Sequence, residues 1–393
     1  MSSIPIETYS AKSYRRIFEM LFMGFVLSGV VGSLNAPVLP TFISRWSLDD
    51  SSAGFFFTAM YLGSLLGTMI SSVVISRGGY QPTLALGYGV VAVGIAGLNF
   101  PSYKLALAAT VVYGIGYGLL VTASNLWGAE YSGTRRAAAV TLLNLAWGIG
   151  AMICPALVLY SLRVGHFGAM FWGVAAGALV LAIGFVKSPF LPHRRLEPDS
   201  GDEMGAPRQG TWIVVGLAFL FFVYVGTENG ISGWSAAHAK RVLLAGDSSW
   251  ALAPSLFFFG LLAGRAMASA ILLQVKEMWV VYGGLIVAAA GTLVELAAKS
   301  RIPLLVGVLV AGLGCSGVYP VFVAWLAEWF GTRARSMGGV MFSLAAIGGA
   351  SLPWLVGFVS KHTDSLRIGL LVPVAGCVAM LAVTALLRPS ARV

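Results

Sequence analysis

The sequence predicts an all-α membrane protein with twelve transmembrane helices in two parallel six-helix repeats. Three observations predict this fold class: an apolar composition, a succession of long apolar segments, and an internal repeat. Of the 393 residues, 58% are hydrophobic and only 10% are charged, whereas soluble domains keep roughly a quarter of their residues charged. A lipid bilayer is therefore the expected surroundings of most of the chain.

A helix needs about 20 apolar residues to cross a bilayer at a rise of 1.5 Å per residue. The only long polar interruption is 190–211, where proline, glycine and mixed charge predict a cytoplasmic linker. We therefore predict an N-terminal bundle over 1–189 and a C-terminal bundle over 212–393. The predicted helices are 17–44, 53–75, 82–100, 104–127, 136–160, 167–189, 212–238, 250–273, 278–298, 303–327, 335–360 and 366–387.

The distribution of lysine and arginine between the two sides of the predicted membrane explains the net charge of +10. Alternate loops carry most of the lysine and arginine, fifteen on one side of the predicted membrane and nine on the other, with Arg265 inside it. Positive residues accumulate on the cytoplasmic side of membrane proteins. This bias predicts a multi-pass protein of a bacterial inner membrane with both termini in the cytoplasm, and it makes nucleic acid an unnecessary partner.

An internal repeat relates the two halves of the chain. A shift of 198 residues aligns the segment that begins at Gly114 with the segment that begins at Gly312, and a shift of 197 aligns Gly29 with Gly226. The halves are therefore two copies of one six-helix unit in the same orientation. Further aligned pairs are Gly63 with Gly260, Gly67 with Gly264, Trp127 with Trp325, Glu130 with Glu328, Arg135 with Arg333, Gly150 with Gly348, and Pro155 with Pro353.

The chain resembles the major facilitator superfamily over essentially its whole length. The resemblance rests on the repeat and on the loop 76–81, which is a degenerate form of the family's G-x-x-x-D-R-x-G-R-R motif. In this loop serine replaces the acid, and the final basic pair is missing. It implies the family's fold, with substrate held between two halves near mid-membrane. It also implies a gating role for Arg77 in this loop.

Three motifs resemble the fucose–galactose–glucose branch of that family, which includes sodium-dependent glucose transporter-like members. They are Gly114-x-Gly116 followed by Ala123-Ser124-Asn125, Leu142-Leu143-Asn144 with Gly148-Ile149-Gly150, and Tyr224-Val225-Gly226-Thr227-Glu228. Fucose permeases place carboxylates in the first and fourth helices, and here those helices carry none near mid-membrane. The branch therefore implies a substrate class, a sugar, and not a full set of site residues.

Glu228 is the strongest candidate for proton coupling. It lies 16 residues into the predicted helix 212–238, about 24 Å from the start of that helix. A charged carboxylate at such depth costs roughly 2.5–3.5 kcal/mol unless it faces a partner or a wet cavity, and burial favours the protonated form. Such a group can take a proton from one side and release it to the other. The alternative is a protonated acid that only holds two helices together.

The surroundings of Glu228 predict a site with an interrupted backbone. The segment 226–234 is rich in glycine and polar residues, and discontinuous helices often mark transport sites, although close helix packing also uses small residues. Arg265 is expected about 12 Å nearer the cytoplasm than Glu228. We expect it to pair with Glu328 or with helix-end carbonyls, or to reach the membrane surface.

Six residues are candidate gating residues near the cytoplasmic ends of the helices. Each repeat carries an acid followed by Gly-Thr-Arg, and acid–base pairs that break and re-form could close an inward gate. The alternative is interfacial charge that only sets topology. The candidates are Arg77, Glu130, Arg135, Arg265, Glu328 and Arg333. At the opposite side, Glu295 is expected to form a structural cap on the outer surface with Lys299 and Arg301.

Amide and aromatic residues on the predicted inner helices could bind a sugar. Amides both donate and accept hydrogen bonds, as a hydroxyl-rich ligand requires, and aromatic faces suit the apolar side of a pyranose ring. Packing within the bundle is the alternative for each aromatic residue. The candidates are Asn35, Asn144, Trp147, Asn229, Trp234, Tyr319, Phe322 and Trp354.

The predicted function is secondary active transport of a small polar solute, with a sugar as the expected substrate, by alternating access with proton coupling through Glu228. Sodium is the rival coupling ion, and an exporter of apolar drugs or lipids is the rival transporter. The sequence contains no Ser/His/Asp set, metal cluster or Cys/His pair at membrane depth, so we expect no enzyme activity and no cofactor. A monomer with a small-molecule substrate is expected.

Overall fold

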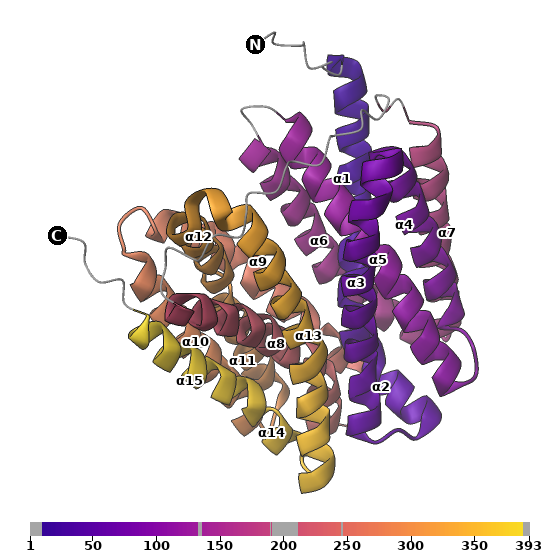
Figure 1. Cartoon of the computed structure of the whole chain (residues 1–393). Helices are drawn as coiled ribbons and strands as arrows, with labels where there is room; N and C mark the ends of the chain where they lie inside the picture. Colours follow the sequence, from indigo (N-terminus) through magenta and orange to yellow (C-terminus); the bar gives the residue numbers. More distant parts are fainter. Residues whose placement is uncertain (1–9, 133–135, 189, 191–210, 245–246, 388–393) are drawn as a thin grey trace, which may run out of the picture. The chain divides into compact units, whose positions relative to one another are not determined.

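The computed structural model describes residues 10–132, 136–188, 190, 211–244 and 247–387, and it is helical almost throughout (Figure 1). The described residues contain no strand. The elements are α1 Ala11–Ser33, α2 Asn35–Trp46, α3 Asp50–Gly78, α4 Tyr80–Gly97, α5 Tyr103–Tyr131, α6 Arg136–Arg163, α7 Phe167–Val186, α8 Thr211–Val242, η2 Ser248–Leu252, α9 Ala253–Ile271, α10 Glu277–Ala297, α11 Arg301–Cys315, α12 Val318–Phe330, η3 Gly331–Arg333, α13 Ala334–Thr363, α14 Leu366–Gly369 and α15 Leu371–Leu386.

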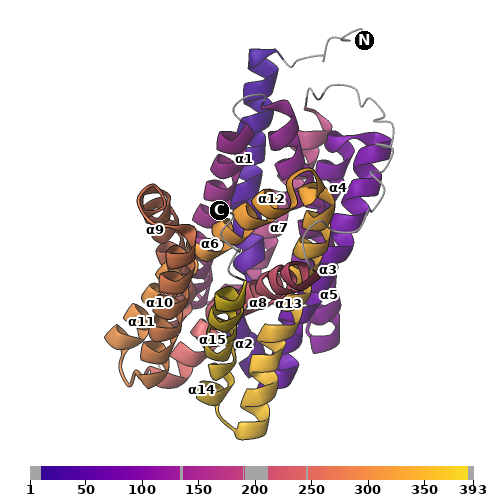
Figure 2. The same ribbon diagram turned by 60° about the vertical axis from the view of Figure 1, so that its left-hand side comes forward.

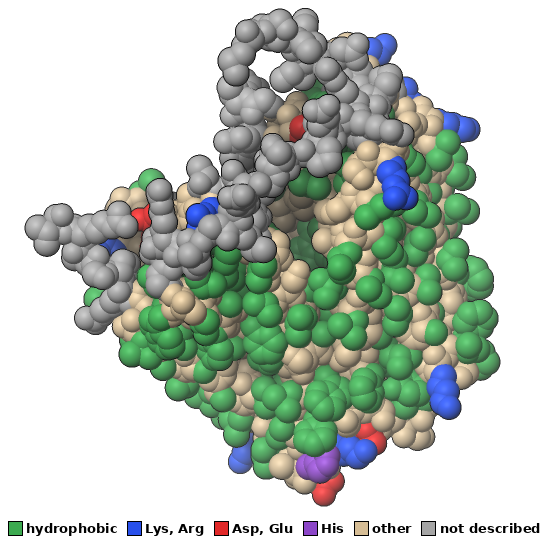
Figure 3. Space-filling model, viewed as in Figure 1, with side chains coloured by type: hydrophobic (Ala, Val, Ile, Leu, Met, Phe, Trp, Pro, Cys, Tyr) green, Lys and Arg blue, Asp and Glu red, His purple; other side chains and the backbone are tan. Residues whose placement is uncertain are grey.

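The described residues of the twelve predicted spans are helical over most of their length, and the fold class is confirmed. Eleven helical segments of the described chain are long and apolar enough to cross a bilayer. The twelfth predicted span corresponds to α4, which has only 18 residues and begins with the polar turn 80–83. On the face drawn in Figure 3, apolar side chains cover the middle and charged side chains gather toward the ends, the distribution that a bilayer requires.

Three predicted helices are interrupted, each three residues before a proline. Proline has no amide hydrogen, so it cannot donate to the carbonyl four residues earlier, and its ring crowds that carbonyl. The predicted helix 17–44 divides into α1 and α2 at Leu34, before Pro37. The helix 303–327 divides into α11 and α12 around Gly317, before Pro320, and 366–387 divides into α14 and α15 at Leu370, before Pro373.

The segment predicted to be discontinuous is an unbroken helix, so that prediction is wrong. Residues 226–234 lie inside α8, which runs without interruption for 32 residues. The glycines admit close neighbours instead of breaking the backbone. A Cβ on Gly226 would lie 2.7 Å from the Gly348 carbonyl oxygen of α13, and one on Gly233 would lie 2.7 Å from the Phe57 ring.

The chain forms two compact units that cut across the two halves of the sequence. The first unit contains Met1–Gly32, Gly63–Ala151 and Gly168–Gly201, and the second contains Ser33–Leu62, Met152–Phe167 and Asp202–Val393. The ends of several N-terminal helices therefore pack with the C-terminal half. The predicted division at 190–211 stays a prediction, and residues 191–210 lie outside the described part of the chain.

The first unit shows how closely its helices approach. A Cβ on Gly150 of α6 would collide with the Val26 carbonyl oxygen of α1, and one on Gly29 of α1 would collide with the Trp147 carbonyl oxygen of α6. Gly63 of α3 likewise meets the backbone of α5 at Val111. Small residues allow this approach, and the resulting van der Waals contact associates helices within lipid.

The second unit repeats these contacts between the equivalent helices. Gly348 of α13 meets the Phe222 carbonyl of α8, as its partner in the repeat, Gly150, meets α1. Gly260 of α9 meets the Leu309 carbonyl of α11, as Gly63 meets α5. Figures 1 and 2 show α8 beside α13 and α9 beside α11. The repeat in the sequence is thus a repeat of helix–helix contacts.

We predict that Gly150→Ala lowers the thermal unfolding midpoint, because the added methyl group must push α1 away from α6. Overpacking of this kind costs about 1–3 kcal/mol. Gly177→Ala is the matched control, since a Cβ at Gly177 meets nothing within 4 Å and alanine favours a helix by up to about 1 kcal/mol over glycine. Midpoints measured in detergent by fluorescence-detected gel filtration compare the two. Equal midpoints would contradict the close contact.

Candidate functional site

A polar cluster surrounds Glu228 where α11 ends and α12 begins. The Tyr224 hydroxyl, one turn before Glu228 on α8, donates to the Cys315 carbonyl oxygen at 2.7 Å. That carbonyl belongs to the last residue of α11, whose successors leave the helix before Pro320. Tyr224 also lies within reach of the Glu228 carboxyl. The break between α11 and α12 therefore supplies a polar group that the α8 side chains use.

Arg265 lies close enough to Glu228 for its charge to act on that carboxyl group, and the expectation that the two occupy different levels stays a prediction. The charge of Arg265 acts on Glu228, Tyr224 and Tyr319, whereas Glu328, its expected partner, is exposed at the other end of α12. Glu228 thus has a cation nearby in the same unit.

Glu228 and Arg265 do not make direct contact. Within the described chain, close ion pairs join Arg241 with Asp50 and Lys361 with Asp49, and Glu228 with Arg265 is not among them. The Arg265 Nε is buried without a hydrogen-bond partner among the described residues. Glu228 itself is half-buried. The two charges therefore influence each other while neither is held by the other.

Tyrosine and phenylalanine rings form one wall of this cluster. The Tyr319 ring stacks on Tyr224 with centroids 5.5 Å apart, and Phe221 packs edge-on against Tyr319 at 5.5 Å. Tyr319 is half-buried, so part of its ring stays accessible. The cluster combines a carboxyl group, a guanidinium group and a partly open aromatic face, a mixture typical of pockets for small polar ligands.

The predicted substrate residues in the second unit fall into two groups. Asn229, Tyr319 and Trp354 are half-buried, and the Trp354 indole nitrogen has no partner among the described residues. Trp234 and Phe322 have no exposed surface, and the Trp234 indole donates to the Pro353 carbonyl at 2.8 Å. These two belong to the packed core of this structure, which corrects their assignment as accessible ligand contacts.

The remaining candidate amides are engaged with backbone. Asn35 is buried and donates to the Phe56 carbonyl at 3.1 Å, which fixes the start of α2 against α3. Asn144 is exposed, and its amide donates to the Val140 carbonyl of its own helix at 2.8 Å. In the first unit, the half-buried Trp147 donates to the Tyr117 hydroxyl at 2.9 Å. Asn144 and Trp147 keep accessible surface, and Asn35 does not.

Four of the predicted gating residues, Arg77, Glu130, Glu328 and Arg333, are exposed or half-buried near helix ends, whereas Arg265 lies inside α9. Arg77 lies in the last turn of α3, and Glu130, near the end of α5, accepts a short hydrogen bond from the Tyr80 hydroxyl. Its predicted partner Arg135 lies outside the described residues. Glu328 is exposed near the end of α12, and Arg333 is half-buried in η3. Their roles as gates stay predictions.

A second charged cluster, which the sequence did not predict, lies where α3 begins. The Asp50 carboxylate accepts two hydrogen bonds from the Arg241 guanidinium of α8, at 2.9 and 2.5 Å, and one from the Ser360 hydroxyl of α13. Asp50 is 8% exposed. We call these three residues the Asp50 cluster. It links a helix of the first predicted bundle to two helices of the second, all within one compact unit.

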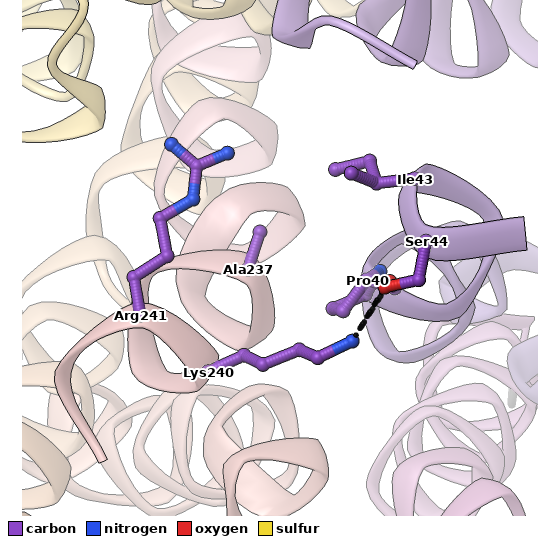
Figure 4. Close-up of a pocket in the computed structure, with 6 residues that line it drawn as sticks. All are labelled: Pro40, Ile43, Ser44, Ala237, Lys240 and Arg241. Carbon is purple, nitrogen blue, oxygen red and sulfur yellow. Dashed lines mark hydrogen bonds between the residues drawn. The ribbon is translucent and has the colours of Figure 1, made fainter. Parts of the chain in front are cut away.

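Weaker contacts surround the Asp50 cluster. The Lys361 ammonium lies 2.8 Å from the Asp49 carboxylate and holds the pKa of that group below its usual value by donating a hydrogen bond to it. Lys240 donates to the Pro40 carbonyl at 3.1 Å and to the Ser44 hydroxyl at 2.9 Å. These residues border a cavity of about 260 Å³ (Figure 4), lined by Pro40, Ile43, Ser44, Ala237, Lys240 and Arg241.

One sequence signal could have pointed to this cluster. Asp50 opens α3, where a carboxylate is stabilised by the helix dipole, and the repeat aligns it with Asp247, whose side chain accepts from the Ser249 amide at the start of η2. Helix capping explains Asp247 fully. Asp50 differs because Arg241 and Ser360 reach it, and a partner nearly 200 residues away cannot be found from helix-end patterns.

Comparison with known proteins agrees with this architecture. The sequence profile of the Major Facilitator Superfamily matches residues 21–298. The sodium-dependent glucose transporter 1 of Rattus norvegicus is 23% identical over 89% of this chain and 80% of its own length. The L-fucose-proton symporter of Escherichia coli is 29% identical, over 37% of this chain and 35% of the symporter.

The fold is also found among solved structures. A mutant of the nucleoside transporter NupG superimposes with a TM-score of 0.79 at 11% identity, over 95% of this chain and the whole of that one. At this identity the likeness extends to the fold alone. The profile match covers well over half of the sequence, and the repeat and its helix contacts agree with it: the chain belongs to the Major Facilitator Superfamily of membrane transporters.

Proposed function

We propose that this transporter moves a small polar solute, a sugar, by alternating access, and that protonation of Glu228 couples the movement to a proton gradient. One observation carries the proposal. Glu228 is a half-buried carboxyl inside the bundle, near a guanidinium group that does not hold it in direct contact. An acidic residue inside the membrane usually has a function, because an acid without one would only reduce the stability of the protein.

The proximity of Arg265 defines how such coupling works. A protonated Glu228 is neutral and does not need Arg265, whereas an ionised Glu228 gains from a direct ion pair. The gap between the two side chains corresponds to the protonated state. Closing that gap favours release of the proton, so a conformational change that moves α8 against α9 shifts the protonation equilibrium. Arg265 thus acts as the counter-charge in the second state.

The sugar assignment rests on the relatives and on the accessible side chains. A sodium-dependent glucose transporter and an L-fucose-proton symporter are among the relatives. In the second unit, Asn229, Tyr319 and Trp354 keep surface that a hydroxyl-rich ring could contact. In the first unit, Asn144 and Trp147 also keep accessible surface. Sodium stays the rival coupling ion, with the carboxyl of Glu228 as an oxygen ligand. An exporter of apolar drugs or lipids is the rival transporter.

We propose the topology that the positive-inside bias predicts, in a bacterial inner membrane with both termini in the cytoplasm. The Asp50 cluster then lies at the outer end of the helices and acts as the outer gate. The Glu130, Arg77, Arg135, Glu328 and Arg333 side chains belong to the inner end. Outer closure is supported by the links from α3 to α8 and α13.

We predict that Glu228→Gln abolishes the acceleration of sugar uptake by an inward proton gradient but keeps exchange across the membrane, because the amide mimics the protonated acid and cannot release a proton. Purified protein in liposomes is assayed with labelled L-fucose, D-galactose and D-glucose under imposed pH or sodium gradients. Glu19→Gln is the matched control, since this acid pairs with Arg15 at an exposed position of α1.

Two outcomes would contradict this assignment. Wild-type uptake that follows a sodium gradient and ignores the pH gradient would replace the proton by sodium. Uptake by Glu228→Gln that responds to the pH gradient as wild type does would remove Glu228 from coupling. Failure of all three sugars to exchange, combined with thermal stabilisation by apolar compounds, would favour the exporter.

We predict that Asp50→Asn opens the outer gate more often, because it removes the charge that Arg241 pairs with. A fully buried pair loses about 3–5 kcal/mol when one partner is removed, and the 43% exposure of Arg241 reduces this cost. We expect roughly tenfold faster modification of Ala237→Cys, equivalent to about 1.4 kcal/mol. Ala237 borders the cavity and is 2% exposed.

The measurement uses purified protein and a thiol-reactive maleimide, in a background where Cys154, Cys315 and Cys377 are replaced by alanine. Asp49→Asn is the matched control, because its ion pair with Lys361 is exposed at both partners and such pairs contribute about 0–1 kcal/mol. Equal modification rates in wild type and Asp50→Asn would show that the cluster is no gate.

A further inference from the structure

Glu295 is a second carboxyl group buried in the helical bundle. It lies near the end of α10, is 0% exposed, and neither of its carboxylate oxygens has a hydrogen-bond partner among the described residues. The expectation that it caps the outer surface with Lys299 and Arg301 is therefore wrong. α11 approaches so closely at Gly307 that a Cβ there would lie 2.5 Å from the Glu295 amide nitrogen, which turns the carboxyl away from solvent.

No positive charge compensates this carboxyl within the described residues. The elements packed against α10 are α11, α12 and α15. On these elements the titratable groups are the Cys377 thiol of α15, Tyr319 and, near the far end, Glu328 of α12, and Cys315 and the exposed Arg301 of α11. An unpaired ionised carboxylate in an apolar interior is so costly that the group neutralises instead. The neutral carboxylic acid is therefore the form that fits these surroundings.

The nearest titratable side chain is His238 of α8. Its ring Nε2 lies 3.3 Å from the Glu295 carbonyl oxygen, and the ring is 2% exposed. His238 lies three residues before Arg241 on α8, so its ring joins the backbone of the buried acid to the helix that carries the arginine of the Asp50 cluster. Neutral imidazole can accept a proton and pass it on.

The repeat argues against a purely structural role for Glu295. Gly94 meets the Ala109 carbonyl and the Tyr113 amide, and Gly291 meets the equivalent Gly307 carbonyl and Ala311 amide. In this alignment Glu295 corresponds to Leu98, which is 0% exposed. The same helix contact is therefore made with a buried leucine in the first half. The contact between these helices therefore does not require a carboxyl group. Because burying a carboxyl group costs stability, its presence at position 295 points to a role other than packing.

We propose that Glu295 is a second proton-binding site, occupied while the Asp50 cluster is closed and emptied through His238 when that cluster opens. His238 and Arg241 lie three residues apart on α8, on neighbouring positions of one face. Movement of α8 that separates Arg241 from Asp50 also moves His238 away from α10 and admits water. The Glu295 O–H bond then breaks, and the proton passes to water or to the imidazole.

This site is separate from Glu228, and its test does not depend on sugar transport. Infrared spectra of purified protein at neutral pH report the C=O stretching band of protonated carboxyl groups. We expect Glu295→Gln to remove a band that Glu228→Gln keeps. Glutamine has nearly the same shape, so folding is preserved, and gel filtration checks it. A Glu295→Gln spectrum that keeps every protonated-carboxyl band would overturn the proposal.

Release is tested by opening the Asp50 cluster. We expect Asp50→Asn to reduce the Glu295 band at least twofold at neutral pH, while Asp49→Asn leaves it unchanged. We also expect His238→Gln to slow the hydrogen–deuterium exchange of this band several-fold. Asp50→Asn can accelerate the modification of Ala237→Cys, which shows that the cluster has opened, and yet leave the Glu295 band unchanged. That combination would show that Glu295 keeps its proton and takes no part in release. A band that falls when NaCl replaces choline chloride would make it a sodium site instead.

Discussion

Polar groups that lie away from water need hydrogen-bond partners within the protein, and this requirement governs the structure. In hydrocarbon an unsatisfied polar group costs several kcal/mol, so helices form along nearly the whole described chain, and each departure from helix has a local cause. The prolines 37, 320 and 373 lie just after the three interruptions. At one of these, the carbonyl of Cys315 receives the Tyr224 hydroxyl. The break that proline imposes thus becomes part of the polar cluster around Glu228.

The two halves share their helix contacts but not their chemistry. Close approaches at Gly150 and Gly348, and at Gly63 and Gly260, are equivalent, so the architecture is duplicated. Three ionisable residues within the helices of the second half, Glu228, Arg265 and Glu295, have no ionisable counterparts at the equivalent positions of the first. The positions equivalent to Glu228 and Glu295 are Val31 and Leu98, both buried. The first half has buried apolar residues at these positions, whereas the second half has ionisable groups that helix packing does not require.

Charge near mid-membrane and charge at the helix ends have different consequences. Glu228 and Arg265 lie near each other without direct contact, so a small movement can form an ion pair between them. At the Asp50 cluster, a buried carboxylate meets a guanidinium and a hydroxyl in direct contact, which favours one closed arrangement of the helix ends. Exposed pairs such as Lys361–Asp49 contribute less because water screens them. Both regions involve α8, which connects Glu228 to Arg241 through a single unbroken helix.

The sequence by itself determined the fold class, the positions of the spans, the family and the repeat. Hydrophobic length and residue periodicity can be read from the sequence directly, and a long apolar segment in lipid forms a helix because a helix satisfies its own backbone hydrogen bonds. It also identified Glu228 as an acid deep in a helix. Tertiary structure decided the rest. Packing brought Arg265 near Glu228 and enclosed Trp234, Phe322 and Glu295. The glycines in α8 allow close helix contact and do not break the helix. The partners of Asp50 come from residues 241 and 360, and only the packed bundle brings such distant charges together.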